Sequence, residues 1–248
     1  MSKILDVIIL GAGTAGLAAL REVRKRTEKF LIINDGPWGT VCARVGCMPS
    51  KALIEAANTF HRRTAFLEFG IHGSDSLQVN ISEVLRRVRR LRDDFVAGTT
   101  KVTTDLGERA ISGRARLVGP NRVEVNGQEW SARNIIIATG SSPVIPQAWN
   151  SFKHHILTTD TLFEQETLPA RMAVVGMGPI GIEMAQALSR LGIEVVGFGR
   201  SPLFAGLTDP HVNDAATVSL TEEWQIYLGE KAELVEMNGK IHVRAGSN

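Results

Sequence analysis

Apolar residues along the chain fall into two series of the same kind, each leading from a short strand through a glycine turn into a helix. The first series consists of the strand Val7–Leu10, a turn from Gly11, a helix to about Lys25 and a strand from Phe30 to Ile33. The second series begins with the strand Met172–Val175 and continues through Val196. Each series is a βαβ unit, so the sequence predicts an α/β protein with two tandem Rossmann-like dinucleotide-binding domains. We place the boundary near residue 150, which gives domains of residues 1–150 and 151–248.

Two longer helices are predicted between these series. One begins near Pro49, with Ser50 and Lys51 in its first turn, and continues to about Phe66. The other covers Ile81–Val96, where apolar residues recur at positions 81, 84, 85, 88, 91 and 95 with the spacing of one helix face. The arginines of this second helix are interpreted as a solvated basic face on its other side: Arg86, Arg87, Arg89, Arg90 and Arg92.

Further strands are predicted downstream of this helix. Ala115–Val118 and Val123–Val125 flank Gly119–Asn121, which is typical of a hairpin. A third apolar strand, Ile135–Ala138, ends at Thr139–Gly140.

The composition is that of an ordinary globular protein and narrows the range of partners. Of the 248 residues, 44% are apolar, and 28 basic residues nearly balance 26 acidic ones, for a net charge of +2. This balance argues against a surface for nucleic acid or membrane. No apolar run approaches the ~20 residues that span a bilayer, and the N-terminus lacks the order of a secretory signal. We therefore expect a cytoplasmic protein.

The first glycine turn has the spacing of a dinucleotide-binding fingerprint in the context that this fingerprint requires, after a strand and opening a helix. Gly11 permits the tight turn, Gly13 lets the backbone approach a pyrophosphate, and Gly16 lets helix and strand pack closely. The anion is then held at the helix N-terminus, where unpaired N–H groups and the helix dipole favour negative charge. Thr14 and Ala15 complete the expected binding turn.

The fingerprint also expects an acid about 20 residues further on, which holds a ribose hydroxyl. Asn34 stands in that place and Asp35 follows it. An amide oxygen can accept from a ribose hydroxyl, and Asp35 can reach the same group, so both are candidate cofactor-binding residues. The alternative, that both are simply turn residues, stays open.

The two cysteines of the chain, Cys42 and Cys47, stand five residues apart at the entrance of a predicted helix. Cytosolic proteins keep few structural disulfides, so a close pair favours catalysis or metal binding. Helix N-terminal N–H groups and nearby cations lower the pKa of a thiol there. A structural zinc site would need further ligands at finger spacing, so we expect no metal. Two inert buried cysteines are the remaining alternative.

The stretch Gly39–Lys51 resembles the active-site signature of pyridine nucleotide-disulfide oxidoreductases. Its Pro-Ser-Lys ending is most similar to dihydrolipoamide dehydrogenases. Mercuric reductases share much of the signature, and glutathione reductases carry a different residue before the lysine. The resemblance extends to the first glycine turn and to two further segments, one with Gly113 and Ala115 and one with Ala138, Thr139 and Gly140.

This resemblance implies FAD bound to residues 1–150 and NAD or NADP bound to residues 151–248. It implies that Cys42 is the interchange thiol facing a dithiol or disulfide substrate, possibly lipoamide on a carrier protein, and that Cys47 lies against the flavin. The exchange runs by thiolate attack through a mixed disulfide. Arg44 replaces the asparagine that relatives commonly carry, and its charge between the thiols can lower their pKa.

The second glycine turn resembles the family's nicotinamide-cofactor site. Glu183 stands where relatives carry an acid near the flavin, and Lys51 resembles the partner of that acid; ordinary surface charges are the alternative. Gly199 replaces the acid of NAD-preferring relatives, and Arg200 offers a guanidinium suited to a 2′-phosphate, which predicts relaxed specificity with NADPH accepted. The alternative, that Arg200 is simply an exposed turn residue, stays open. The residues expected to bind the nicotinamide cofactor in this turn are Gly176, Gly178, Pro179, Ile180 and Gly181.

The family's C-terminal domain supplies a His-Glu pair across a homodimer, and none of the six histidines here stands in that motif. We therefore expect the dimer-interface domain to be missing and the nicotinamide domain to be incomplete, so that the chain alone is inactive. The alternative is a nucleotide-binding or thiol redox module without turnover.

Overall fold

The computed structural model describes residues 4–246 and divides into two compact units. The first unit contains the chain up to Pro49 together with Arg90–Val144, and the second contains Ser50–Arg89 and the chain from Ile145 onward. The first unit thus ends close to the expected boundary near residue 150. Ser50–Arg89, however, groups with the second half of the chain. The assignment of one cofactor to each expected domain stays a prediction.

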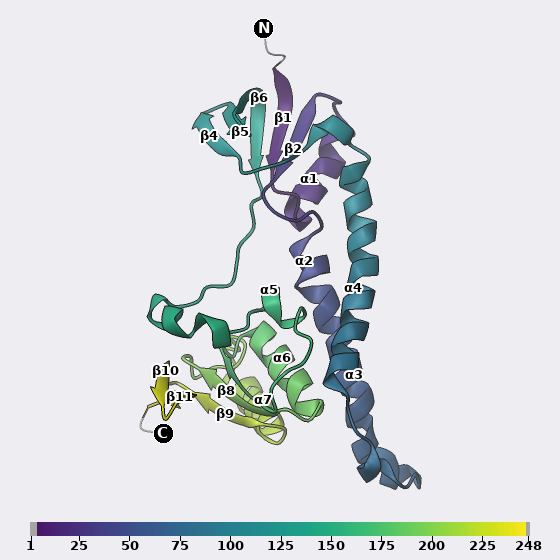
Figure 1. The fold of residues 1–248 in the computed structure, drawn as a ribbon, viewed down its shortest axis with the longest axis vertical. Coiled ribbons are helices and arrows are strands. Elements are labelled where there is room, and N and C mark those ends of the chain that lie inside the picture. Colours follow the sequence, from purple (N-terminus) through teal and green to yellow (C-terminus); the bar gives the residue numbers. More distant parts are fainter. Residues whose placement is uncertain (1–3, 247–248) are drawn as a thin grey trace. The chain divides into compact units, whose positions relative to one another are not determined.

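A six-stranded sheet forms the centre of the first unit, with strand order β3-β2-β1-β6-β5-β4 (Figure 1). β1, β2 and β3 run parallel, as do β1 and β6, whereas β4, β5 and β6 pair antiparallel. The predicted hairpin is therefore confirmed. The strands are β1 Leu5–Leu10, β2 Phe30–Asn34, β3 Ala110–Ser112, β4 Arg116–Gly119, β5 Arg122–Val125 and β6 Gln128–Ile137.

Alternating residues of β1 and β2 bury both faces of this sheet. Ile9 and Ile32 face one cluster, which includes Leu20 of α1 (Thr14–Val23). Ile8 and Leu31 face the other cluster, which includes residues of β5 and β6. Burial on both faces is typical of parallel strands and explains the continuous apolar runs in the sequence. It also holds the carboxyl ends of β1 and β2 rigidly beside the first glycine turn.

The second unit contains a parallel three-stranded sheet with order β7-β8-β9 and a separate antiparallel hairpin, β10-β11. The strands are β7 Arg171–Val175, β8 Glu194–Gly199, β9 Gln225–Leu228, β10 Ala232–Met237 and β11 Lys240–Ala245. Leu188 of α6 (Pro179–Arg190), Val195 of β8 and Trp224 share one buried cluster. Two further helices are α5 Thr159–Leu162 and α7 Pro210–Thr221.

The two long helices differ in extent from their predictions. α3 (Cys47–His61) ends earlier than the expected Phe66 and continues as a 3-10 helix, Arg62–Phe69. Gly70, with φ +73°, stops this 3-10 helix in a left-handed conformation that suits glycine. α4 (Ile81–Thr104) is longer than expected. Shorter elements are the helix α2 Val41–Arg44 and 3-10 helices at Ser74–Ser76, Gly107–Arg109 and Gln147–His155.

The basic side of α4 is only partly the solvated face that the periodicity predicts. Arg86, Arg87 and Arg90 are exposed. Arg89 instead donates to the backbone carbonyls of Phe163 and Gln165, so the prediction is wrong for this residue. Periodicity within one helix cannot anticipate such carbonyls, because they come from a distant segment. A similar correction applies to Arg92, whose side chain is 12% exposed.

Across residues 4–246, no helix is both long and apolar enough to cross a membrane.

Candidate dinucleotide and dithiol sites

In the first glycine turn, Gly11 and Gly16 are tightly packed, whereas Gly13 has open space beside it. Gly11 has φ +102°, and a Cβ atom there would lie 2.2 Å from the carbonyl oxygen of Ala138. A Cβ atom at Gly16 would lie 1.8 Å from the Gly11 oxygen, whereas one at Gly13 meets no atom within 4 Å. Gly11 and Gly16 are therefore required by packing. Gly13 leaves a bare backbone surface, which is the feature that a pyrophosphate needs for close approach.

The start of α1 is available to an anion. Gly13 is its N-cap residue in an extended conformation, and no described side chain caps the helix. Thr14 and Ala15 are exposed, and the first turn carries no acid. The unpaired N–H groups and the positive end of the helix dipole thus face open space.

Asn34 lies at the end of β2, where the fingerprint places the ribose-binding acid. Its Oδ1 accepts a hydrogen bond from the Ala12 N–H at 3.0 Å. Its Nδ2 donates to the carbonyls of Gly36 and Pro37 at 3.1 and 3.2 Å. The amide therefore ties the glycine turn to the loop after β2. A ribose contact by Asn34 or by the exposed Asp35 stays a prediction.

Two segments distant in the sequence join this edge of the sheet. The Gly113 N–H donates to the Asn34 carbonyl at 2.9 Å, and Ala115 follows partly buried. The Ala138 N–H donates to the Leu10 carbonyl at 2.8 Å, which sets Ala138 against the first glycine turn. Thr139 and Gly140 continue from Ala138 and are exposed. All four groups of candidate flavin-binding residues in the first unit thus meet at one edge.

The dithiol segment is folded tightly by one glycine. Cys42 is partly buried in α2, and Cys47 is exposed at the first residue of α3. The Thr40 hydroxyl caps α2 by accepting from the Ala43 N–H at 3.0 Å. A Cβ atom at Gly46 would lie 3.2 Å from the Cys42 Cα and 3.1 Å from the Val41 carbonyl oxygen. Gly46 therefore lets the chain before Cys47 approach the backbone of Cys42.

Arg44 follows Cys42 in the same short helix, and its stem packs on Gly39, where a Cβ atom would lie 3.4 Å from its Cγ and Cδ. Its Nε is buried and has no hydrogen-bond partner within residues 4–246. An effect of its charge on the thiol pKa values stays a prediction.

The second glycine turn repeats the geometry of the first. Gly176 has φ +108°, a Cβ atom at Gly181 would lie 1.8 Å from the Gly176 oxygen, and Gly178 is open. Gly178 is the extended N-cap residue of α6, and Pro179 and Ile180 after it are exposed. The second turn thus offers the same kind of anion site as the first.

The position expected to distinguish NAD from NADP lies at the end of β8. Gly199 is buried, and a Cβ atom there would lie 2.7 Å from Leu228 Cδ2 and 3.2 Å from Met177 Cβ. An acid therefore does not fit at 199 unless these side chains shift. Arg200 is exposed directly after the strand.

Lys51 and Glu183 line one cavity of ≈ 380 Å³ within the second unit. Both side chains are exposed. No ion pair joins the two in the described part of the chain. An ion pair between Lys51 and Glu183 stays a prediction, and both residues line the same cavity.

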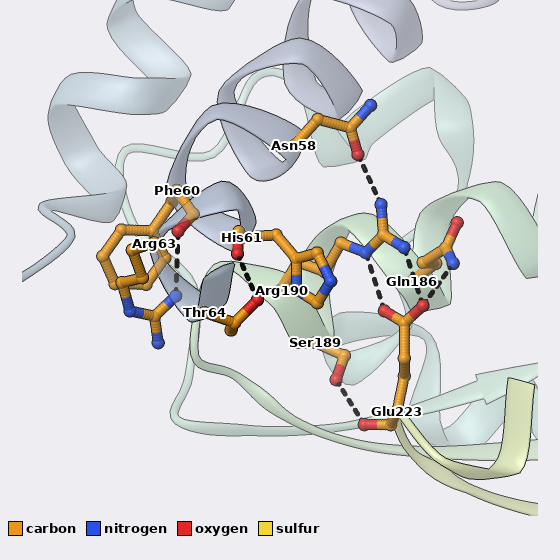
Figure 2. A network of polar contacts seen from close by, with 9 residues as sticks. All are labelled: Asn58, Phe60, His61, Arg63, Thr64, Gln186, Ser189, Arg190 and Glu223. Carbon is orange, nitrogen blue, oxygen red and sulfur yellow. Dashed lines mark hydrogen bonds and ion pairs between the residues drawn. The ribbon is translucent and has the colours of Figure 1, made fainter. Parts of the chain in front are cut away.

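Asn58, Gln186 and Arg190, which the sequence did not predict as site residues, line the same cavity. Figure 2 shows the polar network that they form with Glu223. Arg190 donates from Nε and Nη2 to the two carboxylate oxygens of Glu223, each at 2.7 Å. Its Nη1 donates to Asn58 Oδ1 at 2.5 Å, and Gln186 Nε2 donates to Glu223 at 2.7 Å. Hydrogen bonding from Arg190 lowers the pKa of the Glu223 carboxyl and raises that of Arg190, and both effects outweigh burial. The spacing of seven residues from Lys51 to Asn58, and from Glu183 to Arg190, could have pointed to Asn58 and Arg190, because residues seven apart share one face of a helix.

Comparison with known proteins identifies the family. The sequence matches the family described as pyridine nucleotide-disulphide oxidoreductase over residues 5–247. It is 32% identical over 246 residues to a mercuric reductase of Bacillus cereus, covering 96% of this chain and 38% of that protein. It is 34% identical over 197 residues to a dihydrolipoyl dehydrogenase of Thermus scotoductus, covering 78% and 41%. The HOCl-induced flavoprotein disulfide reductase RclA of Escherichia coli shares the fold, with a TM-score of 0.78 and 20% identity, over 98% of this chain and 53% of that one.

The chain spans about two fifths of the length of these two curated relatives. The family match nevertheless covers almost all of its residues and includes both glycine turns and the dithiol segment. The chain therefore belongs to the pyridine nucleotide-disulphide oxidoreductase family, whose members use FAD and NAD(P).

Proposed function

We propose that the protein carrying this chain transfers electrons between NAD(P) and a dithiol or disulfide substrate through FAD and the Cys42–Cys47 pair. One observation carries this proposal: the backbone at Gly46 lies close to the backbone of Cys42. This approach brings the two cysteines near each other at the start of α3. The two glycine turns of equal geometry supply separate sites for two dinucleotides.

The residues of the first unit fit FAD. The open backbone at Gly13 and the uncapped start of α1 suit its pyrophosphate. The segments at Gly113 and Thr139 lie at the same edge of the sheet and would hold the rest of the nucleotide. When bound, the flavin supplies hydride exchange with the nicotinamide and electron transfer with the dithiol.

The cysteines carry the exchange with substrate. In the direction of disulfide reduction, the Cys42 thiolate attacks one sulfur of the substrate disulfide, forms a mixed disulfide and releases the other sulfur as a thiolate. The Cys47 thiolate then attacks the Cys42 sulfur and releases the second substrate thiolate. The result is a Cys42–Cys47 disulfide, which has given two electrons to the substrate. Oxidation of a dithiol runs through the same steps in reverse.

Dihydrolipoamide on a carrier protein is the substrate that the Pro-Ser-Lys ending after Cys47 favours, and a homodimer is the proposed assembly of the protein. Reduction of Hg²⁺ is the second candidate, because mercuric reductases carry a similar signature and match this chain at comparable identity. A glutathione reductase-like activity is less favoured, since the residue before Lys51 differs from that group.

The test uses the protein purified with FAD, in the longest form that its gene encodes. We expect lipoamide-dependent oxidation of NADH or NADPH, and its loss in both Cys42→Ser and Cys47→Ser. Turnover with Hg²⁺ but not with lipoamide would select the second candidate. Flavin binding without turnover on lipoamide, Hg²⁺ or oxidised glutathione would refute both and favour a binding module.

A further inference from the structure

α3 and α6 line one cavity within the second unit with four residues each, at the same spacing along both helices. The hydrogen bond from Arg190 to Asn58 joins residues 132 positions apart. The same separation relates the other lining residues, as Lys51 with Glu183, Ile54 with Gln186, and Glu55 with Ala187.

A hydrogen bond supports this register at one end of the cavity, and Leu53 and Ala57 of α3 share a buried apolar cluster with Met184 and Ala187 of α6. Asn58 receives its hydrogen bond from a guanidinium that Glu223 already holds in a two-pronged ion pair (Figure 2). The side chains of Arg190 and Glu223 are each 19% exposed, so solvent competes weakly with these bonds. Because Glu223 follows α7, the guanidinium is fixed from a third element and presents one defined donor to α3.

The other end of the register holds Lys51 and Glu183. Each stands seven residues before its anchor, which is two helical turns or roughly 10 Å along the axis. Glu183 is the sole acid of α6, whose sequence is PIGIEMAQALSR. A slip of α3 by one turn would set Lys51 against Pro179 or Ala187, neither of which can pair with an ammonium. The register therefore decides whether Lys51 has an acidic partner.

We infer that Asn58 and Arg190, held by Glu223, are positioning residues that set Lys51 opposite Glu183. The inference deepens the proposed function, because it is in the oxidoreductase that a Lys51–Glu183 pair would act beside the flavin. Neither anchor residue contacts the reacting groups. Their role is to select the register in which the two charged side chains can meet across the cavity.

Carbodiimide cross-linking tests this register in the purified protein with FAD. The reagent activates a glutamate carboxyl and takes up the water lost when the Lys51 amine forms an amide with it. Lys51 has two acids in reach, Glu183 across the cavity and Glu55 one turn along its own helix. The Lys51–Glu55 amide does not depend on register, so the ratio of the two cross-links, measured by mass spectrometry after digestion, reports register alone.

We expect Asn58→Leu to lower the ratio of the Lys51–Glu183 to the Lys51–Glu55 product roughly threefold to tenfold, as expected when one hydrogen bond of ordinary net strength is lost. Asn58→Asp keeps an acceptor for Arg190 and should retain the parental ratio. Arg190→Lys keeps the charge beside Glu223 but lacks the forked donor set. Arg190→Lys should therefore lower the cross-link ratio as Asn58→Leu does. If Asn58→Leu does not fold, Arg190→Lys serves as the test variant instead.

An unchanged ratio in Asn58→Leu or in Arg190→Lys would overturn the inference, as would an equal loss in Asn58→Asp. The measurement needs no substrate. A protein without disulfide turnover would therefore refute the proposed function but not the inferred register. An unchanged cross-link ratio in a protein with disulfide turnover would refute the inferred register but not the proposed function.

Discussion

The side-chain oxygen of Asn34 accepts the backbone N–H of Ala12, 22 residues earlier, and thereby closes the first glycine turn. Ala12 is 2% exposed, so its N–H has no access to water once this acceptor is lost. An unpaired buried donor costs about 1–3 kcal/mol.

Asn34→Leu is accordingly expected to lower the free energy of unfolding by about 2 kcal/mol and to weaken FAD binding. Asn34→Asp preserves an acceptor and serves as the matched control, with stability close to the parent. Urea unfolding and a flavin titration measure the two effects. Equal stability of Asn34→Leu and the parent would show that Ala12 does not depend on this bond.

Gly46→Ala should strain the dithiol segment, since the added Cβ would lie 3.1 Å from the Val41 carbonyl and 3.2 Å from the Cys42 Cα. We expect a loss of about 1–3 kcal/mol and slower disulfide formation between the cysteines. The control is Gly98→Ala in α4, where a Cβ atom meets nothing within 4 Å and which should stabilise the protein by roughly 0.5–1 kcal/mol. Thermal unfolding and thiol titration distinguish the two variants. Similar behaviour of both would mean that the approach at Gly46 is not tight.

The two cysteines are expected to give different flavin spectra. In the FAD-loaded protein, reduced Cys42→Ser should keep a long-wavelength thiolate–flavin absorbance band, because Cys47 is the thiol proposed to lie against the flavin. Cys47→Ser should abolish this band. Absorbance spectra during anaerobic reduction measure it, and loss of the band in both variants would contradict the division of roles.

Arg200→Glu should shift the preference for nicotinamide cofactors toward NADH. Gly199 carries no acid to repel a 2′-phosphate, and Arg200 is exposed beside it. The ratio of kcat/KM for NADPH to that for NADH should fall about tenfold, which corresponds to roughly 1.4 kcal/mol. Arg90→Glu makes the same charge change at an exposed position of α4 and should leave the ratio unchanged. If both variants kept the parental ratio, Arg200 would have no role at the 2′ position.

Glu223→Gln should destabilise the protein in a pH-dependent way. Its folded pKa is lowered, chiefly by hydrogen bonds from Arg190, so the carboxylate contributes stability above the unfolded pKa of a glutamate. That contribution is lost as the pH falls through the lowered folded pKa. At pH 7 we expect a loss of about 2 kcal/mol, less than for a fully buried pair.

The difference between Glu223→Gln and the parent should therefore shrink below about pH 4. Urea unfolding across this range provides the measurement. Glu222→Gln changes the neighbouring exposed acid and should show little effect at any pH. A difference that stayed constant down to low pH would exclude the ion pair as its source.

Local sequence was sufficient for the two βαβ series, the first hairpin and the candidate cofactor-binding turns. Gly11 and Gly176 stand where a positive φ is needed, and this need depends on a few neighbouring residues. The alternating burial of β1 and β2 and the hairpin β4–β5 also follow from short-range periodicity. The two βαβ series and the dithiol segment could thus be identified from residue order, and so could the family.

Only the tertiary structure determined which distant groups pair with which polar side chains. The Asn34 side chain accepts the Ala12 N–H, and Arg89, expected in solvent, donates to the carbonyls of Phe163 and Gln165. The bond between Asn58 and Arg190 spans 132 residues, and no local pattern encodes a register between helices so far apart. Helix periodicity determines which side chains share a face, but only the packing of one helix on another determines which residue each face meets.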